Sequence, residues 1–228
     1  MRTSVFLIAC ACLALTSCKK RAPAEPASGA SGALNGEYTI TSATLPGGSR
    51  GAYPGNVKIQ KTGDYYGIEW SFDHKQSFRG VGIEDGEFLS AGWGMAEDSG
   101  VAVYQIAGGQ LNGRWAASNG SGKLGSEEAT GPSGLNGSYA IVAGRTPNGE
   151  SYDGQLAITP SGNMYRVIRR AGADSFHGAA MKKGSRLFVG WAKGGGAVMV
   201  YTVKDDKLSG QWAQPGSSQL GTEFLRRQ

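Results

Sequence analysis

The sequence predicts an all-β protein built from two small antiparallel barrels in tandem. Glycine accounts for 38 of the 228 residues, and no window of helical length shows the 3.6-residue apolar period of an amphipathic helix. Short alternating runs such as YTITSATL, NVKIQKT and VAVYQIA recur instead, separated by turn dipeptides such as Gly-Asp, Asp-Gly and Asn-Gly. A spacing of roughly 8–12 residues between such runs is typical of a sandwich or a barrel.

Two copies of one pattern follow each other along the chain, in residues 34–131 and 135–228. The offset between matched positions falls from 101 to 96 along the copy, as expected if small deletions lie in turns. Such self-similarity indicates a duplication. The matches include Leu34-Asn35-Gly36 with Leu135-Asn136-Gly137, Gly92-Trp93 with Gly190-Trp191, and Leu111-x-Gly113-x-Trp115 with Leu208-x-Gly210-x-Trp212.

The motif Leu111-x-Gly113-x-Trp115 favours a barrel. Its period of two places all three side chains on one face of a strand. A large ring beside a glycine suits the interior of a small, tightly curved barrel, where small and large residues alternate to fit the taper. We therefore expect two tandem, homologous, calycin-like antiparallel barrels, with a pair of sandwiches as the alternative.

The N-terminus predicts export. Residues 1–17 combine Arg2 with an apolar run that is too short to span a bilayer, as in a cleaved signal peptide. Leu15-Thr16-Ser17-Cys18 resembles the lipobox of bacterial lipoprotein precursors. The resemblance implies cleavage before Cys18 and lipid on that residue, and so a cell-envelope protein held to the membrane by this lipid. Lys19 favours the outer membrane of a Gram-negative cell. The alternative is an ordinary signal peptide with a chance cysteine.

Residues 18–33 read as the lipidated cysteine followed by a disordered tether. Their Pro, Ala, Ser and Gly show no apolar periodicity. The basic residues Lys19 to Arg21 would lie beside the lipid and meet anionic head groups, or else serve as a plain spacer. Because the other two cysteines, Cys10 and Cys12, belong to the signal, we expect no disulfide framework in the folded part.

The net charge of +5 does not indicate a nucleic-acid-binding surface. Six of the 23 basic residues lie in the signal, the tether or the C-terminal end, which leaves 17 against 18 acidic residues, and no basic face is evident. The copies themselves differ in charge. Residues 34–131 hold 7 basic and 11 acidic residues, whereas residues 135–225 hold 10 and 6. Opposite charges steer association with partners, and the alternative is drift on a solvated surface.

Catalytic, metal and cofactor chemistry find little support. The two histidines, His74 and His177, do not occupy matched positions, and no zinc-protease, serine-hydrolase or EF-hand motif occurs. Glu127 and Glu223 do recur, but no partner carboxylate recurs with them. We expect each to accept hydrogen bonds from backbone or tyrosine groups. The sequence therefore predicts a non-catalytic protein without a metal or cofactor.

Aromatic residues that recur in both copies are the candidate binding residues. They are Tyr53, Tyr152, Trp93, Trp191, Trp115 and Trp212. The tyrosines lie in Pro- and Gly-rich segments, where function concentrates, and the tryptophans fit a cavity mouth. The competing interpretation places the tryptophans in the core and packs the tyrosines onto the barrel. Trp70 aligns with Arg169, so the two interiors or mouths cannot be identical.

The motif string as a whole resembles a group of small secreted bacterial β modules, some of which carry a fibronectin-binding label. The shared Tyr-x-Gly, Gly-Trp and Leu-x-Gly-x-Trp-Ala motifs cover both copies, and they imply fold more than function. We expect a non-catalytic envelope lipoprotein that binds an extracellular or envelope protein or matrix partner. The alternative is a carrier of a small apolar ligand in the barrel interior.

Overall fold

The computed structural model describes residues 33–47, 53–73, 76–95 and 98–228. These residues form sixteen β-strands and no helix, which confirms the predicted all-β class. Accordingly, no helix in the described ranges is long and apolar enough to cross a membrane. The predicted signal peptide, Cys18 and all but the last residue of the predicted tether lie outside the described residues. The strands are β1 (Gly36–Thr44), β2 (Gly55–Thr62), β3 (Tyr65–Phe72), β4 (Ser77–Asp85), β5 (Phe88–Gly94), β6 (Ser99–Ala107), β7 (Gln110–Ala117), β8 (Gly125–Thr130), β9 (Gly137–Arg145), β10 (Ser151–Ser161), β11 (Met164–Ala171), β12 (Asp174–Lys183), β13 (Arg186–Ala192), β14 (Gly196–Lys204), β15 (Lys207–Ala213) and β16 (Gly221–Arg227).

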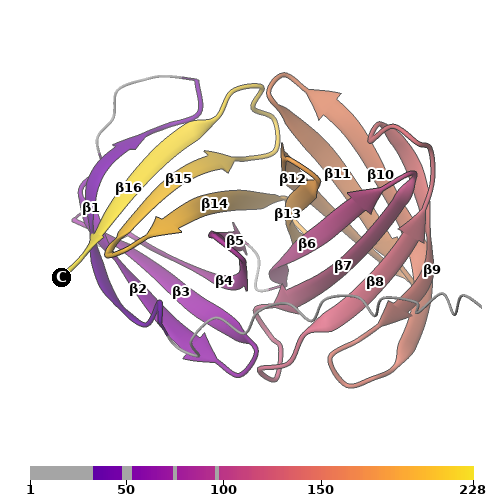
Figure 1. Cartoon of the computed structure of the whole chain (residues 1–228), viewed down its shortest axis with the longest axis horizontal. Coiled ribbons are helices and arrows are strands. Elements are labelled where there is room, and N and C mark those ends of the chain that lie inside the picture. Colours follow the sequence, from indigo (N-terminus) through magenta and orange to yellow (C-terminus); the bar gives the residue numbers. More distant parts are fainter. Residues whose placement is uncertain (1–32, 48–52, 74–75, 96–97) are drawn as a thin grey trace, which may run out of the picture.

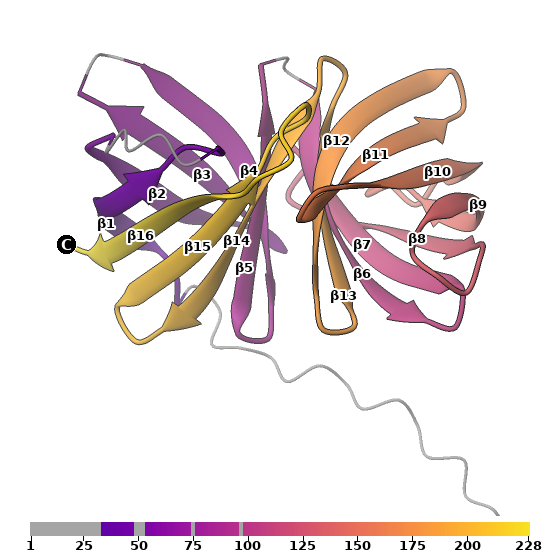
Figure 2. The same cartoon turned by 90° about the horizontal axis from the view of Figure 1, so that it is seen from above.

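Two antiparallel pairings close these strands into two barrels that lie side by side (Figures 1 and 2). Pairing of β5 with β14 closes the first barrel, in the order β14-β15-β16-β1-β2-β3-β4-β5. Pairing of β6 with β13 closes the second barrel, which runs from β6 to β13 without interruption in the sequence. Ring closure removes free sheet edges, so the sandwich alternative does not apply.

The two barrels are not the two sequence copies, and in this respect the tandem arrangement predicted above is wrong. If each copy formed its own barrel, β5 would pair with β6 and β13 with β14. Each barrel instead combines five strands of one copy with three of the other. The second barrel is thus inserted in the sequence between the two parts of the first. Because the copies are homologous, each strand edge meets an equivalent partner in either arrangement, as in domain swapping. The apolar pattern therefore cannot distinguish the two.

This exchange also changes the meaning of the charge split between the copies. Counted by barrel, residues 36–94 and 196–227 hold 9 basic and 10 acidic residues. Residues 99–192 hold 9 basic and 5 acidic residues. The first barrel is therefore close to neutral, and the molecule does not divide into an acidic and a basic lobe.

The three largest apolar clusters of described residues form the core. One fills the first barrel and includes Tyr38 and Ile59, and another fills the second barrel and includes Leu156. The third lies between the barrels and joins residues of both, among them Val81 of β4 and Val101 of β6. Strands β6 and β14 are consequently buried on both faces over their first six residues. This accounts for the unbroken apolar run at the start of VAVYQIA.

The recurring glycines make room for the large rings of the interior. A Cβ on Gly113 would come within 2.3 Å of the Tyr104 ring, which lies directly opposite in register. Gly125 stands in the same relation to Trp115, where the corresponding distance is 2.3 Å. The second copy repeats both contacts. The Leu-x-Gly-x-Trp motif therefore records a structural requirement, because each ring lies over a backbone that carries no side chain.

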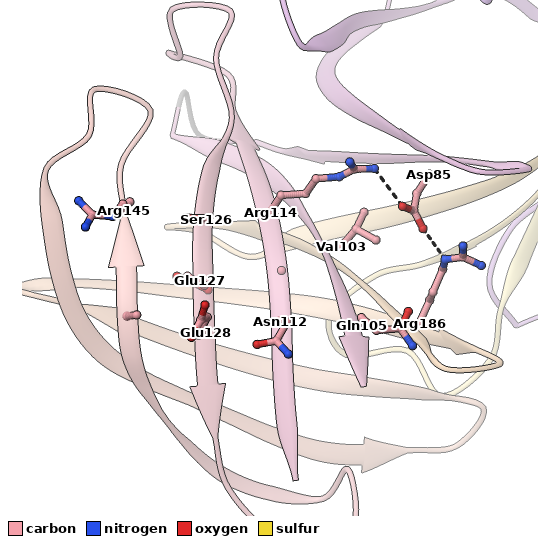
Figure 3. Close-up of a pocket in the computed structure, with 12 residues that line it drawn as sticks. Asp85, Val103, Gln105, Asn112, Arg114, Ser126, Glu127, Glu128, Arg145 and Arg186 are labelled. Atoms are coloured by element: carbon pink, nitrogen blue, oxygen red, sulfur yellow. Dashed lines mark hydrogen bonds and ion pairs between the residues drawn. The ribbon is translucent and has the colours of Figure 1, made fainter. Parts of the chain in front are cut away.

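Ion pairs of one aspartate with two arginines connect the two barrels. Asp85, at the end of β4 in the first barrel, lies between two arginines of the second barrel (Figure 3). Its Oδ1 is 2.9 Å from Arg114 Nη2, and its Oδ2 pairs with Arg186 Nε. Arg114 Nη2 also donates to the Glu84 carbonyl at 2.8 Å. These residues border a polar hollow of about 440 Å³ on the outer face of the second barrel. Two of the arginines that line the hollow are thus already paired with Asp85.

Candidate functional site

Aromatic and polar side chains gather at the same end of each barrel. In the second barrel this end lies where β7, β11 and β13 finish and where β8, β10 and β12 begin. Because side chains alternate between the two faces of a strand, the residues that point inward from these ends meet across the barrel. We call Trp115, Tyr152, Phe176 and Trp191 the second cage. The equivalent residues Trp212, Tyr53, Phe78 and Trp93 form the first cage.

Glu127 is the polar centre of the second barrel, and it is only 1% exposed. Its Oε1 accepts hydrogen bonds from Arg169 Nε at 2.7 Å and from the Tyr152 hydroxyl at 2.7 Å. Arg169 Nη2 donates to the same oxygen, and the Tyr104 hydroxyl donates to Oε2. A buried charge is tolerated when it is paired and hydrogen-bonded. The expectation that this carboxylate accepts tyrosine hydrogen bonds is confirmed.

Arg169 fills the second cage with the protein's own cation. The guanidinium carbon lies between 5.3 and 5.9 Å from the ring centres of all four cage residues. Rings at such distances attract a cation through their negative faces. Burial alone would lower the pKa of Arg169, but the Glu127 carboxylate and the tyrosines raise it above its ordinary value. The guanidinium therefore stays charged, and the four aromatic rings and the Glu127 carboxylate fix its position.

The tyrosines around Glu127 act as fixed hydrogen-bond donors. Burial, followed by the neighbouring Glu127 carboxylate, raises the pKa of Tyr104 and of Tyr152 above the ordinary value. Both hydroxyls thus keep their protons at neutral pH. Tyr152 is oriented by Trp115, whose Nε1 donates to its oxygen at 2.8 Å.

Glu223 occupies the equivalent place in the first barrel, but its described neighbours include no cation within ion-pair distance. It is 2% exposed, and its Oε1 accepts hydrogen bonds from the Tyr201 hydroxyl and from Trp70 Nε1, the latter at 3.1 Å. Trp70 stands where the second barrel has Arg169. Burial raises the pKa of Glu223, although hydrogen bonds from Tyr201, Trp70 and Tyr53 partly oppose this shift.

The first cage surrounds a cavity of about 540 Å³ at the open end of the first barrel. Three tryptophans, Trp70, Trp93 and Trp212, are among the residues that line it. The centres of the Trp70 and Trp93 rings are 5.2 Å apart, and those of Trp93 and Trp212 are 6.0 Å apart. Glu223 is among the residues that line the cavity. The site is therefore an apolar, aromatic pocket with one buried carboxyl group, which suits a small organic molecule.

The mouths of the two barrels differ in polarity. The second opens into a smaller cavity of about 330 Å³, where Lys193 Nζ lies 2.9 Å from Asp98 and 3.4 Å from Asp174. The first has Met95 in the position of Lys193, and Met95 is 86% exposed. Leu45 also lines the first mouth, in the position that Thr146 takes in the second. At these two matched positions the described residues of the first mouth are therefore apolar, although Gln76 and Gln214 also line its cavity.

All six residues proposed from the sequence lie at these mouths, although none is a free surface residue. Tyr53, Trp93 and Trp212 line the first cavity, and Tyr152, Trp115 and Trp191 line the second. Trp191 and Trp212 are buried, whereas the other four are partly buried. The tryptophan rings are packed against the core on one side and border a cavity on the other, and their role in ligand binding stays a prediction.

The sequence puts Trp70 and Arg169 at matched positions but predicts a partner for neither. The contacts of Arg169 with Glu127 and of Trp70 with Glu223 emerge only from the structure. A signal was present in β11, because Val167 and Arg169 alternate on one face and Val167 is buried in the barrel. A lone arginine at an inward position of an apolar face calls for a buried partner.

No group of three or more His, Cys, Asp or Glu side chains that could hold a metal ion occurs in the described parts of the chain. No protein-family model matches this chain, and neither do curated proteins or solved structures. The geometry of the two barrel ends therefore carries the functional argument.

Proposed function

We propose that this protein is a non-catalytic binding protein of the bacterial cell envelope that holds a small, largely apolar molecule in the first-barrel cavity. One observation carries the proposal: a cavity of about 540 Å³, lined by tryptophans and rimmed by apolar residues, opens at one barrel and is replaced at the other by a smaller, polar mouth. Cavities of this size and lining are typical of small-molecule sites.

The envelope location rests on the sequence alone. The lipobox-like Leu15–Cys18 segment supports a lipid anchor on Cys18, and a short tether would keep the barrels close to the membrane surface. A carrier in this position would take up or hand over molecules at the envelope. The non-catalytic part is supported by Glu127, whose two carboxylate oxygens accept hydrogen bonds from Tyr104, Tyr152 and Arg169 within the barrel.

Binding of a protein or matrix partner, the function favoured by the sequence, stays a prediction. The sequence observations in favour of such a partner are the tyrosines in Pro- and Gly-rich segments and the opposite charges of the two copies. Tyr53 and Tyr152 turn inward and contact the carboxylates, and the charges do not divide the barrels into opposite lobes. The cavity therefore gives the stronger argument.

A dye titration tests the proposal. Residues 18–228 with Cys18→Ser, which lack the lipid, are titrated with the uncharged dye N-phenyl-1-naphthylamine, whose fluorescence rises in apolar surroundings. We expect saturable binding at one site. Trp93→Ala removes a wall of the first cavity and should weaken binding by roughly 10-fold to 100-fold, the equivalent of losing about 1.5–3 kcal/mol of ring contact.

Trp115→Ala is the matched control, because Trp115 is a partly buried tryptophan of the second mouth. It should leave dye affinity unchanged. The proposal fails if the wild-type chain shows no saturable binding, or if both substitutions weaken it equally.

A further inference from the structure

The second barrel provides a template for what the first barrel can hold. Its cage of four rings and its buried carboxylate enclose a guanidinium, which is supplied by Arg169 of the same chain. Two N–H groups of this guanidinium donate to Glu127, and the rings pack around its face. The cage chemistry is thus suited to a planar cation with N–H donors.

Among the residues that the structure describes, the first barrel repeats the rings and the carboxyl group of this site but not its cation. Each ring of the second cage has an aromatic counterpart in the first, and Glu223 repeats Glu127. Trp70, in the place of Arg169, donates one hydrogen bond to Glu223 but brings no charge. Over the described residues, the interiors of the two barrels therefore differ by one positive charge beside the buried carboxyl group and by the larger cavity of the first barrel.

We propose that the first-barrel cavity binds an organic cation, a guanidinium, amidinium or ammonium group on an apolar body, with its N–H groups directed at Glu223 and its apolar part among the tryptophans of the first cage. This inference rests on the proposed binding function of the same cavity. The cation does for Glu223 what Arg169 does for Glu127, since it supplies the opposite charge that a buried carboxylate requires.

The cavity size defines the second part of the ligand. A volume of about 540 Å³ exceeds what a bare guanidinium fills, so the remaining space would be occupied by an apolar group that contacts Trp93 and Trp212. The apolar rim at Leu45 and Met95 is consistent with such a group, because a wholly polar cation would gain nothing from it. The ligand class is therefore amphipathic, with a cationic head and an aromatic or aliphatic body.

Benzamidinium and benzamide form a matched pair of probes, because they share shape and ring and differ in the charge and donors of one group. Isothermal titration of both into residues 18–228 with Cys18→Ser should show benzamidinium bound at least tenfold more tightly. Glu223→Gln keeps the side-chain shape and should remove the preference, so that the two probes bind within about twofold of each other. Circular dichroism reports whether this variant is folded.

Trp70→Arg gives an independent test that copies the second barrel. The new arginine should pair with Glu223, as Arg169 pairs with Glu127, and should abolish benzamidinium binding. Equal or tighter binding of benzamide by the wild-type chain would overturn the cation assignment, and so would a preference for benzamidinium that survives Glu223→Gln or Trp70→Arg.

The two proposals fail in different ways. If N-phenyl-1-naphthylamine and benzamide bind but benzamidinium has no advantage, the cavity is a binding site for uncharged molecules and only the cation assignment falls. If the dye and both probes fail to bind, the proposed binding function and the cation assignment are both wrong.

Discussion

Replacing Arg169 by methionine should destabilise the protein strongly, because it leaves Glu127 buried without its charged partner. The Arg169 and Glu127 side chains are 8% and 0% exposed. Removing one member of such a buried pair costs about 3–5 kcal/mol. For a chain of this size, 1 kcal/mol corresponds to about 2–4 °C in Tm. We therefore expect Tm to fall by roughly 6–20 °C.

The double variant Arg169→Met/Glu127→Gln separates this charge effect from lost packing. Removing both charges leaves no unpaired ion, so most of the lost stability should return, to within about 2 kcal/mol of the wild-type value. Urea unfolding of the wild type, both single variants and the double variant completes a double-mutant cycle. The reasoning is refuted if the single substitution costs less than about 1 kcal/mol, as for an exposed pair, or if the double variant is less stable than either single variant.

The remaining predictions concern the first-barrel carboxyl group, the strand exchange and the filled cage. Because the pKa of Glu223 is raised in the folded state, its contribution to stability is complete below its ordinary value of 4.5 and is lost as pH rises through the folded pKa. Urea unfolding between pH 4 and pH 8 should show the wild type losing stability relative to Glu223→Gln, whereas parallel curves would contradict the shift. Phe88 and Thr202 lie opposite each other across β5 and β14, so Phe88→Cys/Thr202→Cys should form a disulfide in the Cys18→Ser background. Phe88→Cys/Gln105→Cys, the pair that a tandem barrel would place opposite, should stay reduced, and the reverse outcome would restore the tandem arrangement. Arg169→Ala should open the second cage, so that calorimetry counts two benzamidinium sites instead of one and added guanidinium raises Tm. A stoichiometry that stays at one would contradict the template argument.

Local pattern was enough to predict the fold class but not the strand partners. The alternation of short runs, the glycine content and the repeated Leu-x-Gly-x-Trp motif indicated small antiparallel barrels, and the paired rings and glycines explain why that motif recurs. The last three strands of each copy join the other copy's barrel, because β5 pairs with β14 and β13 with β6. Either strand edge would offer an equivalent partner. No residue pattern within one copy carries that information.

The sequence predicted which residue types form the candidate site, but not which charged and hydrogen-bonding groups contact one another there. The repeated tryptophans and tyrosines marked the barrel ends, since a ring that recurs in a duplication has a conserved place in both barrels. The pairing of Arg169 with Glu127 required knowledge of which strands face each other across the barrel. Whether a cage is open or filled depends on one position, Trp70 or Arg169, and on the space that each side chain leaves.

Native mass spectrometry of the full-length protein, purified under gentle conditions from the cells that produce it, shows whether the first-barrel cavity carries a bound molecule. We expect one small molecule bound per chain, lost on denaturation and absent from the Trp70→Arg variant, whose own arginine would occupy the first cage. A wild-type chain that carries no bound molecule, or a bound mass that persists unchanged in Trp70→Arg, would contradict the claim that the first-barrel cavity is the functional site.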